Sequence, residues 1–385
     1  MKTWKVLGVV AYALFMDYFI YGLVVPLTPH SPVGAMSEDR MAILFASYAA
    51  GVLGATPLFG YLGDHLGCRR PMIIGVALSA VATLLFCIAP SYPLLIVARV
   101  CQGAASAATW TAGLALVAET YPMRRVEMMG YALVGSTAGS IIGPSLGGVL
   151  FEWGGFSLPF LVTAVLVAID AAMRISLLPS DRASGQASIP LRPLLTDRAI
   201  LVPALAVALA AFGWGIIEPL FPERLAKFGA TPSAVGVIFT VSTVLYGLSA
   251  PIVGWASGRV SVKRVIAFGG AAMAVSLVLI GLAPNAILAA AGLCLLSVSF
   301  AFTLNPTSAE LGNAVDRLGL SCYSAVYAVY NIAYSIGMMA TNALAAIASE
   351  KLGFLNTLLC AAVGLLICAP LFLQKDVPAA TIRNN

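Results

Sequence analysis

Charged side chains are scarce in this sequence. Only 10% of its 385 residues are Asp, Glu, Lys or Arg, and 60% are hydrophobic. A soluble domain carries roughly 25% charged residues, so the composition excludes an ordinary water-soluble domain. The formal net charge of +5 acquires a meaning only when the basic residues are placed along the chain.

The residues that build metal or catalytic sites are also few. The two histidines, His30 and His65, lie far apart in the sequence, and the seven cysteines contain no CxxC pair. The sequence shows no nucleophile with a neighbouring base, no cluster of metal ligands and no phosphate-binding loop. We therefore expect no enzymatic activity, no metal and no cofactor.

Long apolar runs dominate the chain instead. Twelve of them are long enough to cross about 30 Å of hydrocarbon as α-helices. They cover residues 4–26, 41–63, 71–90, 92–118, 128–150, 156–178, 199–222, 233–256, 262–283, 286–311, 320–346 and 353–374. A polar stretch, 179–198, separates six runs from six. The sequence predicts an all-α integral membrane protein with an N-terminal bundle (1–180), a cytoplasmic linker (181–198) and a C-terminal bundle (199–385).

The basic residues indicate the orientation. With the N-terminus in the cytoplasm, about sixteen of the 21 Lys and Arg fall on the inner side, as the positive-inside rule requires. The basic balance is therefore a topology signal, and we expect no nucleic-acid binding. Both termini are predicted to be cytoplasmic, and short outer loops without a glycosylation acceptor favour a bacterial inner membrane.

Three motifs follow one another in the first half. GYLGDHLGCRR (60–70) connects the second and third runs, RVCQG (99–103) lies in the fourth, and GYALVGSTAGSIIGPSLGG (130–148) lies in the fifth. A glycine repeat alone is weak, because Gly is frequent in membrane helices. Three motifs in this order, on these helices, are a far more specific signal.

The combination resembles the major facilitator superfamily. The first motif is similar to the superfamily's loop between helices 2 and 3, the second to its helix 4 motif, and the third to the helix 5 motif of its proton-coupled drug antiporters. The resemblance implies the major facilitator fold, with two six-helix bundles around a site near the bilayer midplane. The halves also repeat weakly, since GWASGRVSVKRV (254–265) follows the eighth run.

The first motif implies a conformational latch. In the family, the acidic residue of this loop, here Asp64, bridges to the other half near the start of helix 11, around Leu320–Ser321, and stabilises the outward-facing state. A glycine in the loop is expected to relieve backbone strain in a tight turn. The predicted latch residues are Asp64, Gly67, Arg69 and Arg70.

The third motif implies close packing of helix 5. Small residues on one face let a helix backbone approach its neighbour, and Pro144 is expected to bend the helix. The motif residues are Gly130, Gly139, Gly143, Pro144, Gly147 and Gly148.

A closer resemblance points to the branch of the vesicular amine transporters and bacterial multidrug antiporters. Met16-Asp17 in the first run and the sequence EPLFP (218–222) in the seventh are similar to elements of that branch. The chain departs from it at three positions. Amine transporters carry a Lys after the helix 2 stretch and an Asp in helix 11, where this chain has Tyr48 and Asn331. Their helix 10 Asp falls near Leu304-Asn305 and is also missing, so coupling stoichiometry and substrate charge are open.

Asp17 is the most conspicuous polar residue in the membrane runs. An ionised carboxylate at the centre of a membrane helix costs at least about 2.5–3.5 kcal/mol. It is either paired permanently with Arg99, or it faces water and exchanges a proton or a substrate cation, or Arg99 holds it in one state and releases it in another. Glu218 is a second functional candidate, whereas Asp170 and Arg174 have the spacing of a structural i,i+4 pair.

Aromatic residues complete the candidate site. Four tyrosines of helix 11, at 323, 327, 330 and 334, share one helical face, which suits either half of an aromatic box for an organic cation or simple core packing. The candidates for proton coupling and substrate binding are Asp17, Glu218, Arg99, Tyr21, Tyr48, Trp110, Trp214, Asn305, Tyr327, Tyr330, Asn331 and Tyr334.

Three functions remain open from the sequence. The leading one is proton-coupled export of a small organic compound, cationic or amphipathic, as in multidrug efflux, by a monomer in the lipid bilayer. The second is a carrier of an anionic or zwitterionic metabolite, such as a polycarboxylate or siderophore-like compound, anchored by Arg99. The third is a ligand sensor or facilitator without proton coupling.

Overall fold

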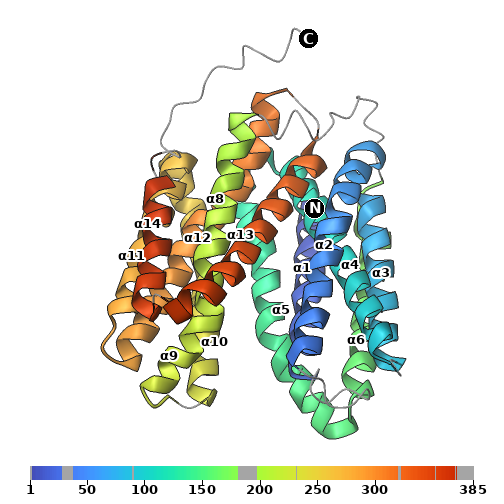
Figure 1. The fold of residues 1–385 in the computed structure, drawn as a ribbon. Coiled ribbons are helices and arrows are strands. Elements are labelled where there is room, and N and C mark those ends of the chain that lie inside the picture. The colour runs from blue at the N-terminus through green and yellow to red at the C-terminus, as the bar shows by residue number, and fades with distance from the viewer. Residues whose placement is uncertain are drawn as a thin grey trace. The chain divides into compact units, whose positions relative to one another are not determined.

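The computed structural model describes residues 2–27, 38–88, 91–180, 197–230, 232–319, 322–351, 353–368 and 370. Within these ranges the chain is helical and contains no strand (Figure 1). The helices are α1 (Lys2–Leu27), α2 (Glu38–Leu66), α3 (Arg69–Ile88), α4 (Tyr92–Thr120), α5 (Arg125–Gly154), α6 (Ser157–Leu177), α8 (Arg198–Gly215), α9 (Ile217–Lys227), α10 (Pro232–Arg259), α11 (Val262–Leu282), α12 (Ala286–Arg317), α13 (Tyr323–Lys351) and α14 (Gly353–Cys368).

The helices are built for a membrane. Among the described residues, ten are long and apolar enough to span one, and Gly353–Ile367 is a shorter apolar helix. Each predicted run coincides with one helix except the run 199–222, which is two. There α8 ends at Gly215 and α9 begins at Ile217. Pro219 has no backbone N–H to donate to the carbonyl of Gly215 four residues earlier, which weakens a continuous helix at this point. Proline alone does not explain the break, because α2, α5 and α12 each continue through an internal proline.

The chain divides into two compact units. Unit 1 is Met1–Ile189 with Ser321–Asn331, and unit 2 is Pro190–Leu320 with Ile332–Asn385. The predicted boundaries at 180 and 198 stay a prediction. The units differ from them in one segment, because the first turns of α13 pack on α2. A Cβ atom at Gly60 would lie 2.8 Å from the Cβ of Ala328, so only glycine lets these helices approach so closely.

In unit 1, α1 packs against α5, while α2 and α3 pack against α4, and α3 also packs against α6. The contact between α1 and α5 is backbone on backbone. A Cβ at Gly135, Gly139 or Gly143 would collide with a carbonyl oxygen of α1, and one at Gly147 would crowd Leu23. These glycines recur every four residues and therefore line one stripe of α5. They fix α1, and with it Asp17, in unit 1.

In unit 2, α12 is the central helix. It packs against α8, α10 and α11, and α11 packs in turn against α14. Close approach of α11 and α12 again depends on a glycine, because a Cβ at Gly269 would lie 2.7 Å from the backbone nitrogen of Thr303. The α12 residues that face these neighbours, from Ala289 to Val315, are largely buried.

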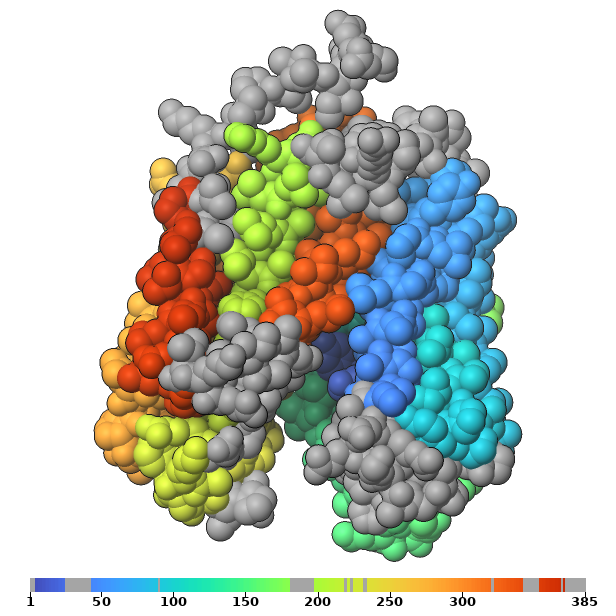
Figure 2. Space-filling model, viewed as in Figure 1, coloured from blue at the N-terminus to red at the C-terminus, as the bar shows by residue number. Residues whose placement is uncertain are grey.

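The outer faces are apolar. Exposed aliphatic side chains lie on α2, α3 and α4, among them Leu58, Leu84 and Val97. Figure 2 shows these three helices, in blue to cyan, forming a continuous face of unit 1. In a protein with this composition, an apolar exterior of membrane-length helices is the surface that faces lipid.

We predict that the stripe on α5 tolerates no side chain. Gly139→Ala should lower the free energy of unfolding by about 1–3 kcal/mol, because the methyl group meets the backbone of Phe15. Gly148→Ala is the matched control, since no atom lies within 4 Å of a Cβ there. Thermal denaturation in detergent measures both. Equal midpoints for the two variants would contradict this account of the helix contact.

Candidate functional site

Asp17 lies in the middle of α1 and is buried in unit 1, with 7% of its surface exposed. Its Oδ2 atom accepts hydrogen bonds from Ser106 Oγ and Trp110 Nε1, both at 2.8 Å. The two donors are four residues apart on α4 and therefore share one helical face. In the described part of the chain, Asp17 forms no ion pair; its hydrogen-bond donors are neutral, and the charge of Arg174 acts on it without an ion pair.

Two tyrosines extend the polar group around Asp17. The hydroxyl of Tyr48, on α2, donates to Ser106 Oγ at 3.0 Å. The ring of Tyr21, one turn after Asp17 on α1, lies with its centroid 4.9 Å from that of Tyr48. The structure thus brings together four sequence-predicted residues, Asp17, Tyr21, Tyr48 and Trp110.

Arg99 is buried without a carboxylate beside it. It is fully inaccessible, its Nη1 donates to Gln102 Oε1 at 2.9 Å, and its Nε and Nη2 have no hydrogen-bond partner. The guanidinium carbon lies 4.7 Å from the ring centroid of Phe45 and 5.4 Å from that of Tyr21. Aromatic faces attract a cation but leave its remaining N–H groups unsatisfied. The permanent Asp17–Arg99 pair considered from the sequence is not formed in this structure.

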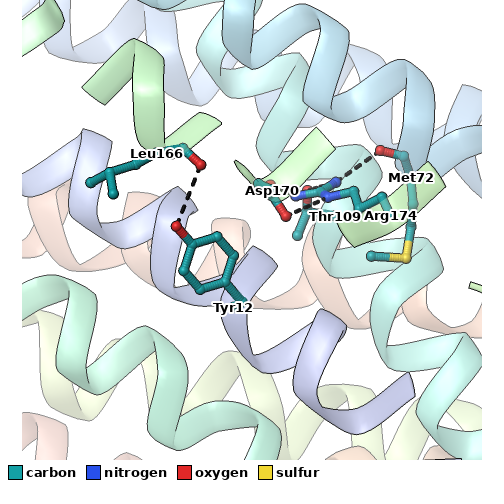
Figure 3. A network of polar contacts seen from close by, with 6 residues as sticks. All are labelled: Tyr12, Met72, Thr109, Leu166, Asp170 and Arg174. Atoms are coloured by element: carbon teal, nitrogen blue, oxygen red, sulfur yellow. Dashed lines mark hydrogen bonds and ion pairs between the residues drawn. The ribbon is translucent and has the colours of Figure 1, made fainter. Parts of the chain in front are cut away.

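A second acid in unit 1 is fully paired. Arg174 Nε and Nη2 donate to the two carboxylate oxygens of Asp170 at 3.0 and 2.6 Å, and both side chains are 2% exposed. Figure 3 shows the same guanidinium reaching α3 and α4 through the Met72 carbonyl, at 2.8 Å, and Thr109 Oγ1, at 3.2 Å. The pair predicted from the i,i+4 spacing therefore joins three helices.

Figure 3 also shows how α6 contacts α1. The Tyr12 hydroxyl donates to the Leu166 carbonyl at 3.4 Å. Tyr12 lies five residues before Asp17, and Thr109 immediately precedes Trp110. Polar contacts from α6 thus reach α1 and α4, two of the three helices that carry the Asp17 group.

The start of α13 is bound by an acid of α2. Asp64 accepts hydrogen bonds from the backbone N–H groups of Ser324, at 2.8 Å, and Ala325, at 3.0 Å. A carboxylate is favoured at a helix N-terminus, where backbone N–H groups and the helix dipole both attract negative charge. Leu320 and Ser321, where the resemblance places this bridge, lie outside the described residues, and the latch role stays a prediction.

The other predicted latch residues lie around the same turn. Gly67 has a φ of 81°, the left-handed conformation in which a side chain would be strained. The Arg69 Nη2 donates to the Ile175 carbonyl at 2.6 Å, whereas Arg70 is exposed.

Three further contacts hold the first turns of α13 in unit 1. Arg125 Nη2, on α5, donates to the Tyr323 hydroxyl at 3.0 Å. Tyr327 of α13 contacts Met129 of α5, with 3.6 Å between the Tyr327 hydroxyl and the Met129 sulfur. Farther along α13, Asn331 Nδ2 donates to Thr111 Oγ1 of α4 at 3.0 Å. The ring of Tyr330 lies 6.5 Å from that of Tyr327.

The remaining candidates belong to unit 2. Trp214 stacks on Phe300 with centroids 5.3 Å apart, and Tyr246 donates to Asn305 Oδ1 at 3.0 Å. Tyr334 is half-buried and groups with unit 2, so the tyrosine stripe of α13 is shared between the units. Glu218 lies in α9 just after the break at Ile216, and its side chain is outside the described residues.

The sequence also resembles a known family across nearly its whole length. The family model described as the Major Facilitator Superfamily matches residues 7–205 and 203–384. The chain belongs to the Major Facilitator Superfamily. The predicted all-α membrane fold is confirmed. The superfamily consists of transporters rather than enzymes.

Relatives place this superfamily member near the vesicular amine transporters. It is 30% identical to the chromaffin granule amine transporter of Rattus norvegicus, over 82% of this chain and 61% of that protein. It is 28% identical to the synaptic vesicular amine transporter of Homo sapiens, over 84% of this chain and 65% of that protein. The chain thus spans less than two thirds of the length of these amine transporters.

Two comparisons cover longer shares of the matched chains. An uncharacterised transporter of the superfamily from Schizosaccharomyces pombe, C18.02, is 27% identical over 92% of both chains. Among solved structures, the human organic anion transporter MFSD10 matches 96% of this chain and 99% of its own, with a TM-score of 0.78 and 16% identity. The E. coli fucose:proton symporter FucP follows with a TM-score of 0.75. At this identity the two structures show the fold alone.

Sequence analysis of this superfamily member missed several contact residues. Ser106 had a usable signal, because it precedes Trp110 by four residues and therefore faces the same way. Arg125 is one of the basic residues of the predicted inner side, and nothing in the sequence indicates its hydrogen bond to Tyr323. Tyr246 and Phe300 carry no local signal, since their importance arises only from what α12 places beside them.

We predict that the Asp170–Arg174 pair is required as a pair. Arg174→Met should cost about 3–5 kcal/mol of stability, because it leaves a buried carboxylate uncompensated. The double variant Asp170→Leu/Arg174→Met should recover most of this loss. Arg124→Met is the control, since the Arg124–Glu127 pair is 57% and 29% exposed and such pairs contribute about 0–1 kcal/mol. Denaturation in detergent measures the stability of each variant. A double variant as unstable as Arg174→Met would contradict the prediction.

Proposed function

We propose that this chain is a proton-coupled antiporter that exports a small organic cation, and that Asp17 binds the cation and the proton in turn. The observation that supports the proposal is the carboxylate of Asp17, buried in α1 with neutral donors on one oxygen and, among the described residues, no ion pair. A membrane-embedded acid without a partner is a functional site by default.

The exchange follows from charge neutralisation. A buried carboxylate is destabilised by loss of water unless a cation or a proton compensates it. The organic cation and the proton therefore compete for the same oxygens. When Asp17 faces the cytoplasm, it binds the organic cation. When it faces the other side of the membrane, where protons are more concentrated, a proton displaces the cation. Alternating access of this single group gives antiport.

Ser106, Trp110 and Tyr48 set the selectivity of this group. Ser106 and Trp110 both donate to Oδ2, which leaves Oδ1 to receive the ammonium hydrogen. Trp110 and Tyr21 supply aromatic faces of the kind that attract organic cations. The resemblance implies a Lys in helix 2, an Asp in helix 10 and an Asp in helix 11, and this chain has Tyr48, Asn305 and Asn331 in those stretches. Because two acids are missing, we propose that fewer protons are exchanged per cycle than in a transporter that keeps them.

The remaining assignments belong to the same proposal. A bacterial inner membrane, cytoplasmic termini, a monomer and the absence of a cofactor stay predictions, and the amine transporters named above come from animals. Multidrug efflux is the broadest form of the proposal, and export of one amine is the narrowest.

We predict that Asp17→Asn abolishes accumulation driven by a pH gradient in proteoliposomes, with uptake of an organic amine falling to the level of protein-free vesicles. The amide cannot take up a proton in this range, so exchange loses its coupling. Glu127→Gln, at an exposed acid of α5, is the matched control and should transport normally. Gradient-driven uptake by Asp17→Asn at the control rate would refute the role of Asp17. Gradient-independent uptake by the unmodified protein would favour a facilitator, and binding without uptake a sensor.

Arg99 favours a second candidate, a carrier of a zwitterionic or anionic compound. Its Nε and Nη2, together with the Nε2 of Gln102, are three buried donors that have no partner among the described residues. A carboxylate would satisfy them and neutralise the guanidinium, since carboxylates bind arginine through two oxygens at once. In this alternative, Arg99 is the substrate anchor.

This alternative makes its own prediction. If a carboxylate binds at Arg99, affinity for a zwitterion such as 6-aminohexanoate should exceed that for hexylamine, and Arg99→Met should remove the difference, about tenfold, while hexylamine binding persists. Calorimetry on the purified protein measures both ligands. Equal affinities in the unmodified protein would eliminate the carboxylate anchor.

A further inference from the structure

The middle of α12 contains a buried amide whose hydrogen bonds are incomplete. Asn305 is 1% exposed and immediately precedes Pro306, in a helix most of whose residues between Ala289 and Val315 are buried. Its Oδ1 accepts a hydrogen bond from the Tyr246 hydroxyl at 3.0 Å. Its Nδ2 is buried and has no hydrogen-bond partner among the described residues. A side-chain amide has two N–H donors there.

Such a donor is unusual, because buried polar groups are nearly always paired. The described neighbours of Asn305 within α12 do not accept a hydrogen bond from its Nδ2. Ser308 donates to the Asn305 carbonyl, and Thr303 donates to Ser299 and contacts Met273. The amide nitrogen therefore requires an acceptor from outside the described residues of unit 2.

Tyr246 connects Asn305 to a group of aromatic rings. Trp214 of α8 stacks on Phe300 of α12 with an interplanar angle of 25°. The ring of Tyr246, from α10, lies 5.5 Å from that of Phe300, and its hydroxyl binds Asn305. Three helices of unit 2 thus contribute to one group of rings with a single free donor at its edge. Trp214 and Tyr246 are only half-buried, so their rings can contact a ligand.

We propose that Asn305, Tyr246, Phe300 and Trp214 form a binding subsite for an aromatic group that carries an oxygen acceptor, such as an aryl ether or aryl ketone. The ring packs on the aromatic side chains, and the oxygen accepts a hydrogen bond from Asn305 Nδ2. This inference rests on the proposed function in one respect: it assumes that the aromatic compound bound here is the transported substrate. The subsite sets the substrate class by acceptor chemistry, independently of the charge bound at Asp17.

The test compares ligands that differ in one oxygen atom. The probes are 4-methoxyphenethylamine and 4-ethylphenethylamine, which have the same shape, with calorimetry on the purified full chain in detergent. The methoxy compound should bind about tenfold more tightly, because only it satisfies the amide. Asn305→Leu should reduce the ratio to about one, and Asn305→Asp should reverse it, because a carboxylate repels an ether oxygen.

Thr303→Val is the matched control on α12 and should keep the tenfold ratio, because the Thr303 hydroxyl bonds within its own helix and to Met273. A neutral pair, 4-propylanisole and 1-ethyl-4-propylbenzene, separates this proposal from the previous one. If only the neutral pair binds and keeps the oxygen preference, the subsite stands and the cation proposal falls. An equal ratio in the unmodified protein and Asn305→Leu, or no binding of either pair, overturns the subsite.

Discussion

Everything in unit 1 is organised around one buried carboxylate. Asp17 lies on a helix with apolar neighbours, and the donors of α4 reach only one of its oxygens. This arrangement requires α1 and α4 to be held precisely, since a hydrogen bond weakens within a few tenths of an ångström and with angle. The glycine stripe of α5 fixes α1 from one side, and the polar contacts of α6 reach α1 at Tyr12 and α4 at Thr109. Packing elsewhere in the unit thus positions the group that we propose exchanges ions.

The buried charges discussed above differ in how their surroundings compensate them. Asp170 and Arg174 neutralise each other through two short hydrogen bonds and are therefore a fixed structural joint. Asp64 is compensated by the N-terminus of α13, a partial charge that a small conformational change can remove. Among the described residues, Asp17 and Arg99 form no ion pair, although the charge of Arg174 acts on Asp17. Only groups of the last kind can bind and release an external ion without first breaking an internal pair, which is why we assign transport to Asp17 and not to Asp170.

The helices, the superfamily and much of the Asp17 group could be predicted from the sequence, because each of them depends on local sequence patterns. Hydrophobic length defines the spans, glycine spacing indicates the close packing of α5, and an acid in an apolar run is conspicuous. The break at Ile216 could not be predicted from Pro219, because α2, α5 and α12 each continue through an internal proline. The partners of Asp17 and Asn305 could not be predicted, because they lie on other helices of the same unit: α4 beside α1 in unit 1, and α10 beside α12 in unit 2. The order of these residues along the chain says nothing of their distance in space.

The central claim is that a proton and an organic cation compete for Asp17. Proton release on binding tests it most directly, by calorimetry of an organic amine in buffers with different ionisation enthalpies across the acidic and neutral range. The account predicts that binding at acidic pH releases about one proton per bound amine, that the release disappears at higher pH, and that Asp17→Asn releases none. Amine binding without proton release at any pH would contradict it.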